Sequence, residues 1–184
     1  MRSASGRMKT ADMAYIALFA VVLSLCSWIT IPGIVPYTMQ TFGVFTAIGV
    51  LGGKRGTMAV LIYLLLGAIG LPVFSGFAGG IGYLMGATGG YILGFAFAAL
   101  TMWGMELLIG RRKGRLFLAF MAGLVVCYGF GTLWFLWVYY GRINGTGLWT
   151  ALTLCVFPYV VPDLIKMGLA LAVSRKISQS LRMI

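Results

Sequence analysis

The chain alternates between long apolar stretches and short segments rich in basic residues, proline or glycine. Between Gly56 and Met105 no side chain carries a charge. A water-soluble fold needs polar residues on its outer face, and this stretch supplies almost none. Because a helix needs about 20 mostly apolar residues to cross a bilayer, the pattern predicts six transmembrane helices. The predicted spans are residues 11–30, 41–53, 57–71, 91–109, 116–139 and 158–174.

Composition supports an all-α membrane protein with one domain over residues 1–184. The chain is 61% hydrophobic and 9% charged, whereas a soluble domain carries roughly a quarter charged residues. Residues 41–53 and 57–71 are short for a bilayer of about 30 Å. We therefore expect one of these two helices to begin inside a loop or to lie where the membrane is thinner.

The net charge of +11 is distributed in a way that favours membrane topology over nucleic-acid binding. Basic residues form short clusters beside the apolar stretches, as in cytoplasmic loops, where anionic lipid adds attraction. We predict cytoplasmic N and C termini, and a retained first helix because no cleavage site follows it. The clusters are Arg2, Arg7 and Lys9; Lys54 and Arg55; Arg111, Arg112, Lys113 and Arg115; and Arg175, Lys176 and Arg182.

Three segments without regular apolar periodicity fall on the opposite, outer side of this topology: residues 32–40, 72–91 and 142–162. The first contains two prolines and a glycine, which break helices. The second contains seven glycines and no charge. Non-helical backbone near a membrane is tolerated where it is buried in protein or lines a cavity. We expect these segments to cover a ligand pocket, and residues 148–157 to lie in the membrane interface.

Asp163 and Lys166 are the opposite charges set deepest in apolar sequence. Residues three apart lie on the same side of a helix, so the two can pair. The pair fits either a structural ion pair or a polar floor for a ligand, since ionisable groups in membrane segments usually serve function. Gln40 can bind a ligand or cap the second helix, and the hydroxyls of Tyr37, Thr88 and Tyr91 are weaker candidates.

The sequence contains few residues that could bind a metal ion, catalyse a reaction or bind ATP. The sequence has no histidine, and its acids are Asp12, Glu106 and Asp163. Cys26, Cys127 and Cys155 lie far apart, so we expect no metal site, cofactor or catalytic pair. We expect Glu106 to be neutralised by nearby arginines. No phosphate-binding loop occurs, so energy for transport must come from another polypeptide.

Three motifs resemble the BioY family, the biotin-specific S components of energy-coupling factor (ECF) transporters. They are VPYTMQTFG (Val35 to Gly43), YLLLGAIGLPVFSGFAGGIGYLMGATGGY (Tyr63 to Tyr91) and FPYVVPDLIKMGLA (Phe157 to Ala170). Their order and spacing match the family over nearly the whole chain. Ala87 departs from it, because the family commonly has proline there.

The resemblance implies a six-helix S-component fold that captures biotin at the outer face of a bacterial cytoplasmic membrane. Asp163 would accept the ureido N–H groups, and Lys166 would contact the ureido oxygen or the carboxylate. Gln40 and the 79–91 segment, with Gly79, Tyr83, Thr88 and Tyr91, would complete the pocket. The implied partners are membrane lipid, a transmembrane coupling subunit and two ATP-binding subunits.

Two other functions are weaker alternatives: an S component for a different vitamin, and an intramembrane enzyme acting on lipids. One further pattern stays open. Ala14, Ala17, Ala20 and Ser24 share one face of the first span, and small residues allow close helix contact. This face fits either packing within the chain or docking of another membrane subunit.

Overall fold

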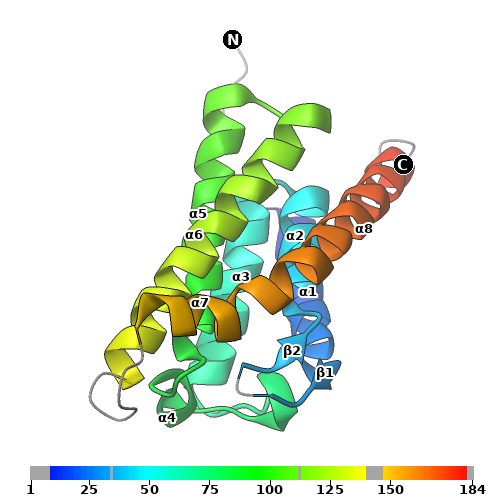
Figure 1. The fold of residues 1–184 in the computed structure, drawn as a ribbon. Helices are drawn as coiled ribbons and strands as arrows, with labels where there is room; N and C mark the ends of the chain where they lie inside the picture. The colour runs from blue at the N-terminus through cyan, green and yellow to red at the C-terminus, as the bar shows by residue number, and fades with distance from the viewer. Residues whose placement is uncertain (1–8, 34, 112, 140–146, 182–184) are drawn as a thin grey trace.

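The computed structural model describes residues 9–33, 35–111, 113–139 and 147–181, and these are almost entirely helical. Figure 1 shows the arrangement as a bundle of long helices with short elements gathered at one end. The elements are α1 (Thr10–Trp28), β1 (Thr30–Ile31), β2 (Tyr37–Thr38), α2 (Gln40–Leu51), α3 (Gly53–Ala68), the 3-10 helix η1 (Ser75–Phe77), α4 (Ile81–Leu84), α5 (Gly89–Ile109), α6 (Lys113–Tyr139), α7 (Leu148–Cys155) and α8 (Phe157–Leu181).

Helix α2 lies at the centre of the bundle, in contact with α1, α3, α5 and α8. Every residue from Gly43 to Leu51 is buried. A helix enclosed by other helices has no need to match the thickness of the bilayer, which explains why only 12 residues suffice. The longer helices α5 and α6 pack side by side over their length (Figure 1).

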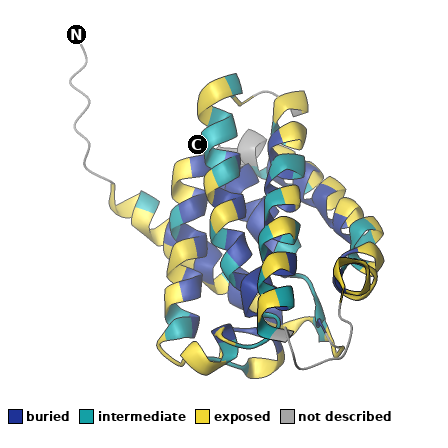
Figure 2. Cartoon of the chain, turned by 60° about the vertical axis from the view of Figure 1, so that its left-hand side comes forward, coloured by how far each residue is buried: buried dark blue, intermediate teal, exposed yellow. Residues whose placement is uncertain are grey.

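The outer surface of the bundle is apolar. Figure 2 shows buried residues on the inward faces of the helices and exposed residues on the outward faces. Many of those outward residues are large hydrophobic side chains, including Leu65, Ile69, Leu108, Val125 and Leu133, each at least 64% exposed. Soluble monomers rarely expose such continuous apolar surface. With several long apolar helices, this surface identifies a multi-pass membrane protein.

Helices occupy all six predicted spans, but four of them are long and apolar enough to qualify as membrane-spanning among the described residues: α1, α5, and the parts of α6 and α8 at 114–138 and 157–177. Helix α8 continues to Leu181, beyond the predicted end at residue 174. The sequence predicts that Pro158 and Pro162 both lie at the start of the last helix, since proline is well placed in a first turn. Pro162 instead lies inside α8, so the helix lacks one backbone N–H donor there.

The three irregular segments contain more structure than the sequence suggested. In the first, β1 and β2 pair antiparallel, with Thr30 opposite Thr38. The second contains η1 and α4, and an isolated bridge between Phe74 and Ala78 pairs the residues on either side of η1. In the third, residues 148–155 form the short helix α7, while residues 142–146 lie outside the described part.

At the opposite end of the bundle, Glu106 is bound to a backbone group, and its neutralisation by nearby arginines stays a prediction. Its carboxylate accepts a hydrogen bond from the backbone N–H of Gly53 at 2.7 Å, at the first residue of α3. Arg111 instead donates to the carbonyls of Gly49 and Val50 at the end of α2. These two side chains join the α2–α3 turn to the end of α5. Arg112 lies outside the described residues.

The small-residue face of α1 (Ala14, Ala17, Ala20 and Ser24) is partly buried within the chain and partly accessible to another subunit. Ala20 and Ser24 are buried, whereas Ala14 and Ala17 are exposed. The half nearer β1 therefore packs within the chain. The half nearer the start of α1 is accessible, and its use as a docking face stays a prediction.

Candidate ligand-binding site

A pocket opens at the end of the bundle where the irregular segments gather. The space it encloses, counted together with its open mouth, is about 560 Å³. Its walls come from the start of α2, the start of α5, the middle of α6, the end of α7 and the start of α8. The pocket lies where the sequence predicted one.

Asp163 and Lys166 form the polar side of this pocket. The Lys166 ammonium lies 2.9 Å from Asp163 Oδ1, which confirms that the two residues pair. The two residues are 3% and 5% exposed. A buried ion pair costs more in desolvation than it gains unless further hydrogen bonds satisfy both charges, so the surroundings of each charge decide what the pair can do.

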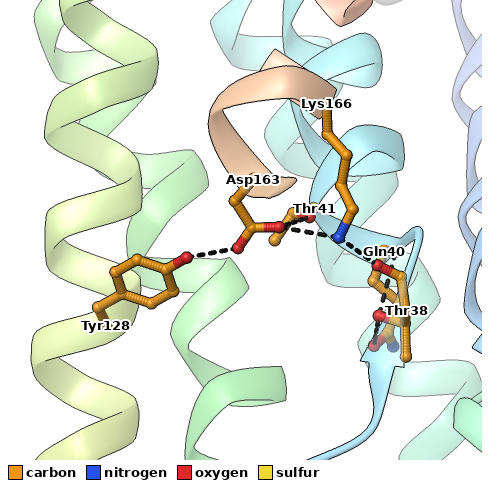
Figure 3. A network of polar contacts seen from close by, with 6 residues as sticks. All are labelled: Thr38, Gln40, Thr41, Tyr128, Asp163 and Lys166. Carbon is orange, nitrogen blue, oxygen red and sulfur yellow. Dashed lines mark hydrogen bonds and ion pairs between the residues drawn. The ribbon is translucent and has the colours of Figure 1, made fainter. Parts of the chain in front are cut away.

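The carboxylate of Asp163 is held by two hydroxyl groups as well as by Lys166 (Figure 3). Thr41, in the first turn of α2, donates to Oδ1 at 2.8 Å. Tyr128, in the middle of α6, donates to Oδ2 at 2.6 Å. Three helices that are distant in sequence therefore meet at one carboxylate, and its charge is stabilised by three donors.

The ammonium of Lys166 is bound to the first irregular segment. It donates to the carbonyl oxygen of Thr38 at 2.6 Å, and it lies 4.2 Å from the centre of the Tyr37 ring, within cation–π range. Burial, with a smaller contribution from the charge of Asp163, raises the pKa of Tyr37. The ring therefore stays a neutral phenol at physiological pH and remains a favourable neighbour for a cation.

Gln40 lines the pocket and is also the first residue of α2. Its side-chain oxygen accepts a hydrogen bond from Thr38 at 2.9 Å, and its nitrogen donates to Tyr63 at 2.5 Å. One N–H of the amide remains beyond these two contacts. Gln40 thus joins the strand β2 to the buried hydroxyl of Tyr63 while retaining one donor.

The opposite wall comes from the glycine-rich segment and the start of α5. Tyr83, Thr88 and Tyr91 all line the pocket. The hydroxyl of Tyr91 lies 3.2 Å from that of Thr132, and Tyr83 donates to the Ser75 carbonyl at 3.3 Å. Rings held in this way present apolar faces to a ligand.

Gly79 does not line the pocket. A Cβ atom at this position would lie 2.2 Å from the carbonyl oxygen of Leu71. Glycine is therefore required by close backbone packing within the loop and not by contact with a ligand. The other predicted site residues, Asp163, Lys166, Gln40, Tyr83, Thr88 and Tyr91, do come together around the pocket.

Several pocket residues were not singled out in the sequence. Thr38, Thr41 and Tyr128 contact the charged pair directly, and Cys127, Cys155 and Tyr159 line the walls. Hydroxyl and thiol residues are common inside membrane helices, so their sequence context is uninformative. Over the described ranges, no three side chains form a metal-binding group.

The segments around the mouth are joined to one another by hydrogen bonds. Tyr159 of α8 donates to the Val35 carbonyl, and Thr30 lies 3.0 Å from Ser75, hydroxyl to hydroxyl. At the end of α1, Trp28 donates to the Pro72 carbonyl at 2.9 Å. The end of α1 and strand β1 are thus bound to the second irregular segment, and the first irregular segment is bound to α8.

Comparisons with known proteins point to one family. Residues 1–183 match the BioY family. A probable biotin transporter BioY of Pyrococcus horikoshii is 38% identical, covering 92% of this chain and 98% of that protein. The biotin transporter BioY of Thermotoga maritima is 37% identical, covering 88% and 92%.

A solved structure agrees on the fold. The crystal structure of the S-component for biotin from an ECF-type ABC transporter superimposes with a TM-score of 0.80 at 24% identity, covering 94% of this chain and 95% of that one. The S-component fold implied by the resemblance is thereby confirmed, and the relatives are transport proteins and not enzymes. The chain belongs to the BioY family.

Proposed function

We propose that this chain is the substrate-capturing S component of a biotin importer. The observation that carries the proposal is the buried Asp163–Lys166 pair, set in an apolar and aromatic pocket of a BioY-family chain. Biotin has an apolar bicyclic body with a ureido group at one end and a carboxylate at the other. Such a ligand suits a pocket with apolar walls and a few convergent polar groups.

In this proposal the ureido group lies against the charged pair. Asp163 accepts N–H hydrogen bonds, and Lys166 donates to the ureido oxygen or to the carboxylate. Tyr83, Thr88 and Tyr91 provide the opposite wall, and Gln40 offers its remaining N–H. Lys166 directs two of its three N–H donors to Asp163 and to the Thr38 carbonyl, so the third can reach a ligand while both bonds are kept.

We further propose that α1, α2, α3, α5, α6 and α8 all cross the bacterial cytoplasmic membrane and that residues 1–184 form one domain. The basic residues Lys54, Arg55, Arg111 and Arg115 lie at helix ends opposite the pocket. Under the positive-inside rule that end is cytoplasmic, together with both termini, and anionic lipid contacts it. The pocket then faces outward.

Transport against a gradient requires an energy source, and the sequence has no phosphate-binding loop of its own. The proposed partners are an ECF transmembrane coupling subunit and two ATP-binding subunits. In the cycle expected for such a complex, the S component topples so that its pocket faces the cytoplasm. The accessible half of the α1 small-residue face is one candidate for contact with the coupling subunit.

The test is equilibrium binding of labelled biotin to the purified full-length chain in detergent or nanodiscs. We expect saturable binding that unlabelled biotin abolishes and that excess riboflavin or thiamine leaves unchanged. Displacement by riboflavin or thiamine would instead assign the pocket to another vitamin. Absence of biotin binding at saturating concentration would refute the proposal. Co-purification with the coupling and ATP-binding subunits tests the partners separately.

A further inference from the structure

The turn at η1 holds an exposed phenylalanine where the backbone conformation favours glycine. Phe77 has a φ of +58°, which bulky residues rarely adopt. The residue before it, Gly76, has a similar φ of +70° and tolerates it because glycine has no Cβ atom. Phe77 is 63% exposed, so packing in the core does not explain its ring. Backbone outliers of this kind concentrate at functional positions, which points to a role for the ring outside the chain.

The contact that the ring does make is with Trp28, the last residue of α1. The two ring centres lie 4.9 Å apart. The indole N–H of Trp28 donates to the Pro72 carbonyl, so its polar group is already satisfied within the chain. The exposed parts of both rings are therefore apolar, and tryptophan is enriched where a membrane meets water.

The two rings continue an apolar stripe along α1. Leu18, Val21 and Leu25 are exposed, and their spacing of three or four residues places them on one face of the helix with Trp28. This stripe belongs to the apolar outer surface that identifies a membrane protein. Phe77 extends that surface from the end of α1 onto the second irregular segment.

The surrounding segment offers neither charge nor an exposed polar side chain. Between residues 69 and 85 every exposed residue is apolar or glycine, and this end of the molecule shows exposed stretches in Figure 2. The large exposed side chains are Ile69, Leu71, Phe77, Ile81 and Met85. A protein interface usually includes about one hydrogen bond per 100–200 Å², which these side chains cannot supply. Lipid acyl chains require none, so lipid is the partner that this surface fits.

We infer that Phe77 and Trp28 form a membrane anchor, in which the two rings insert among the lipid acyl chains of the leaflet on the pocket side. Ser75, two residues before Phe77, lines the pocket, and its carbonyl accepts a hydrogen bond from Tyr83 of the same wall. The anchor therefore joins one wall of the pocket to the bilayer. This role is independent of which ligand the pocket binds.

The test measures the depth of nitroxide labels on the full-length chain in nanodiscs of phosphatidylcholine and phosphatidylglycerol. Labels are attached to Phe77→Cys and, with the phenylalanine kept, to Ile81→Cys. Leu65→Cys on the exposed face of α3 is the lipid reference, and Lys54→Cys at the opposite end of the bundle is the water reference. The three native cysteines are buried, and wild-type protein treated with the label gives the background. Power saturation compares collisions with oxygen, which partitions into lipid, and with a nickel chelate, which stays in water.

We expect oxygen to reach the labels at 77 and 81 more readily than the nickel chelate does, as at Leu65, and the reverse at Lys54. Adding Phe77→Ser to the Ile81→Cys protein should shift its oxygen-to-nickel ratio toward that of Lys54, because the ring no longer holds the segment in lipid. Phe117→Ser, at an exposed phenylalanine of α6, is the matched control and should leave the ratio at 81 unchanged.

Three results would overturn the inference. A label at 77 with the accessibility of the Lys54 reference would place the turn in water. A label at 77 that neither reagent reaches would mean that protein, such as a second copy of the chain, covers this surface. An unchanged ratio at 81 after Phe77→Ser would show that the ring does not hold the segment. None of these measurements uses biotin, so their failure is distinct from failure of the proposed function.

Discussion

The two ends of the bundle each contain an acid paired with a base, at nearly the same distance. Asp12 and Arg55 lie 3.0 Å apart and Asp163 and Lys166 lie 2.9 Å apart. The side chains of Asp12 and Arg55 are 17% and 49% exposed, against 4% and 6% for Asp163 and Lys166. Two ion pairs with the same contact distance can therefore differ widely in burial, and the distance alone does not indicate how much each contributes to stability or binding.

The difference lies in what surrounds each pair. Around Asp12 and Arg55, solvent screens the charges, and such pairs contribute about 0–1 kcal/mol to stability. Around Asp163 and Lys166, the desolvation cost is offset by Thr41, Tyr128 and the Thr38 carbonyl. The three additional hydrogen bonds fix both charges in position, as the proposed contacts with a ligand require.

Substitution of the buried acid should have the largest effect. Asp163→Asn removes the charge that Lys166, Thr41 and Tyr128 share and leaves a buried ammonium unpaired. We expect biotin affinity to fall about 100-fold, measured by equilibrium binding in nanodiscs. Asp12→Asn is the matched control and should bind like the wild type. If Asp163→Asn binds biotin within threefold of the wild type, the Asp163 carboxylate does not contribute to biotin binding.

Substitution of the buried base should have the next largest effect. Lys166→Met keeps much of the side-chain length but removes the donor to the Thr38 carbonyl and to the ligand. We expect biotin affinity to fall about 30-fold, with Lys54→Met, an exposed lysine of α3, as control. Equal affinities for Lys166→Met and the control would show that Lys166 serves the fold alone.

A smaller effect, on stability and not on binding, is expected from Glu106→Ala. The backbone N–H of Gly53 is buried and would lose its acceptor, at a cost of about 1 kcal/mol. For a chain of this length that corresponds to a fall of about 2–4 °C in Tm, measured by thermal unfolding in detergent. Glu106→Gln keeps an acceptor oxygen for the Gly53 N–H, so its Tm should fall less than that of Glu106→Ala. An equal fall in Tm would show that the negative charge of Glu106, and not its acceptor oxygen, stabilises the turn.

The smallest effect is expected at the exposed pair. Arg55→Gln should change the unfolding free energy by less than about 0.5 kcal/mol after screening and should leave biotin affinity unchanged. If Arg55→Gln lowers the Tm more than Glu106→Ala does, the exposed ion pair contributes more to stability than we infer from its exposure.

The positions of the helices and the polar end of the pocket could be predicted because both depend on local sequence. Apolar length gives the helices, and the three-residue spacing of Asp163 and Lys166 places both on one side of α8. The scarcity of charge made this pair conspicuous. The same reasoning fails for Pro162, because whether proline ends or continues a helix depends on the packing around it.

The residues that complete the site could not be predicted because they come from other helices. Nothing near Tyr128 in the sequence distinguishes it from Tyr139 or Tyr140, and only the packing of α6 against α8 brings its hydroxyl to Asp163. Gly79 illustrates the converse. A glycine in an apolar loop fits ligand contact and close backbone packing equally well, and the nearby Leu71 carbonyl identifies the second.

The hydrogen bonds that join the segments around the pocket mouth affect the rates at which a ligand binds and dissociates. Tyr159 holds the Val35 carbonyl and Thr30 meets Ser75, so widening the mouth for a bulky ligand requires contacts of this kind to break. Association that waits for a conformational opening is slower than the usual 10⁵–10⁷ M⁻¹s⁻¹. A molecule whose release depends on the same opening stays bound longer, and we expect slow dissociation of this kind from this pocket.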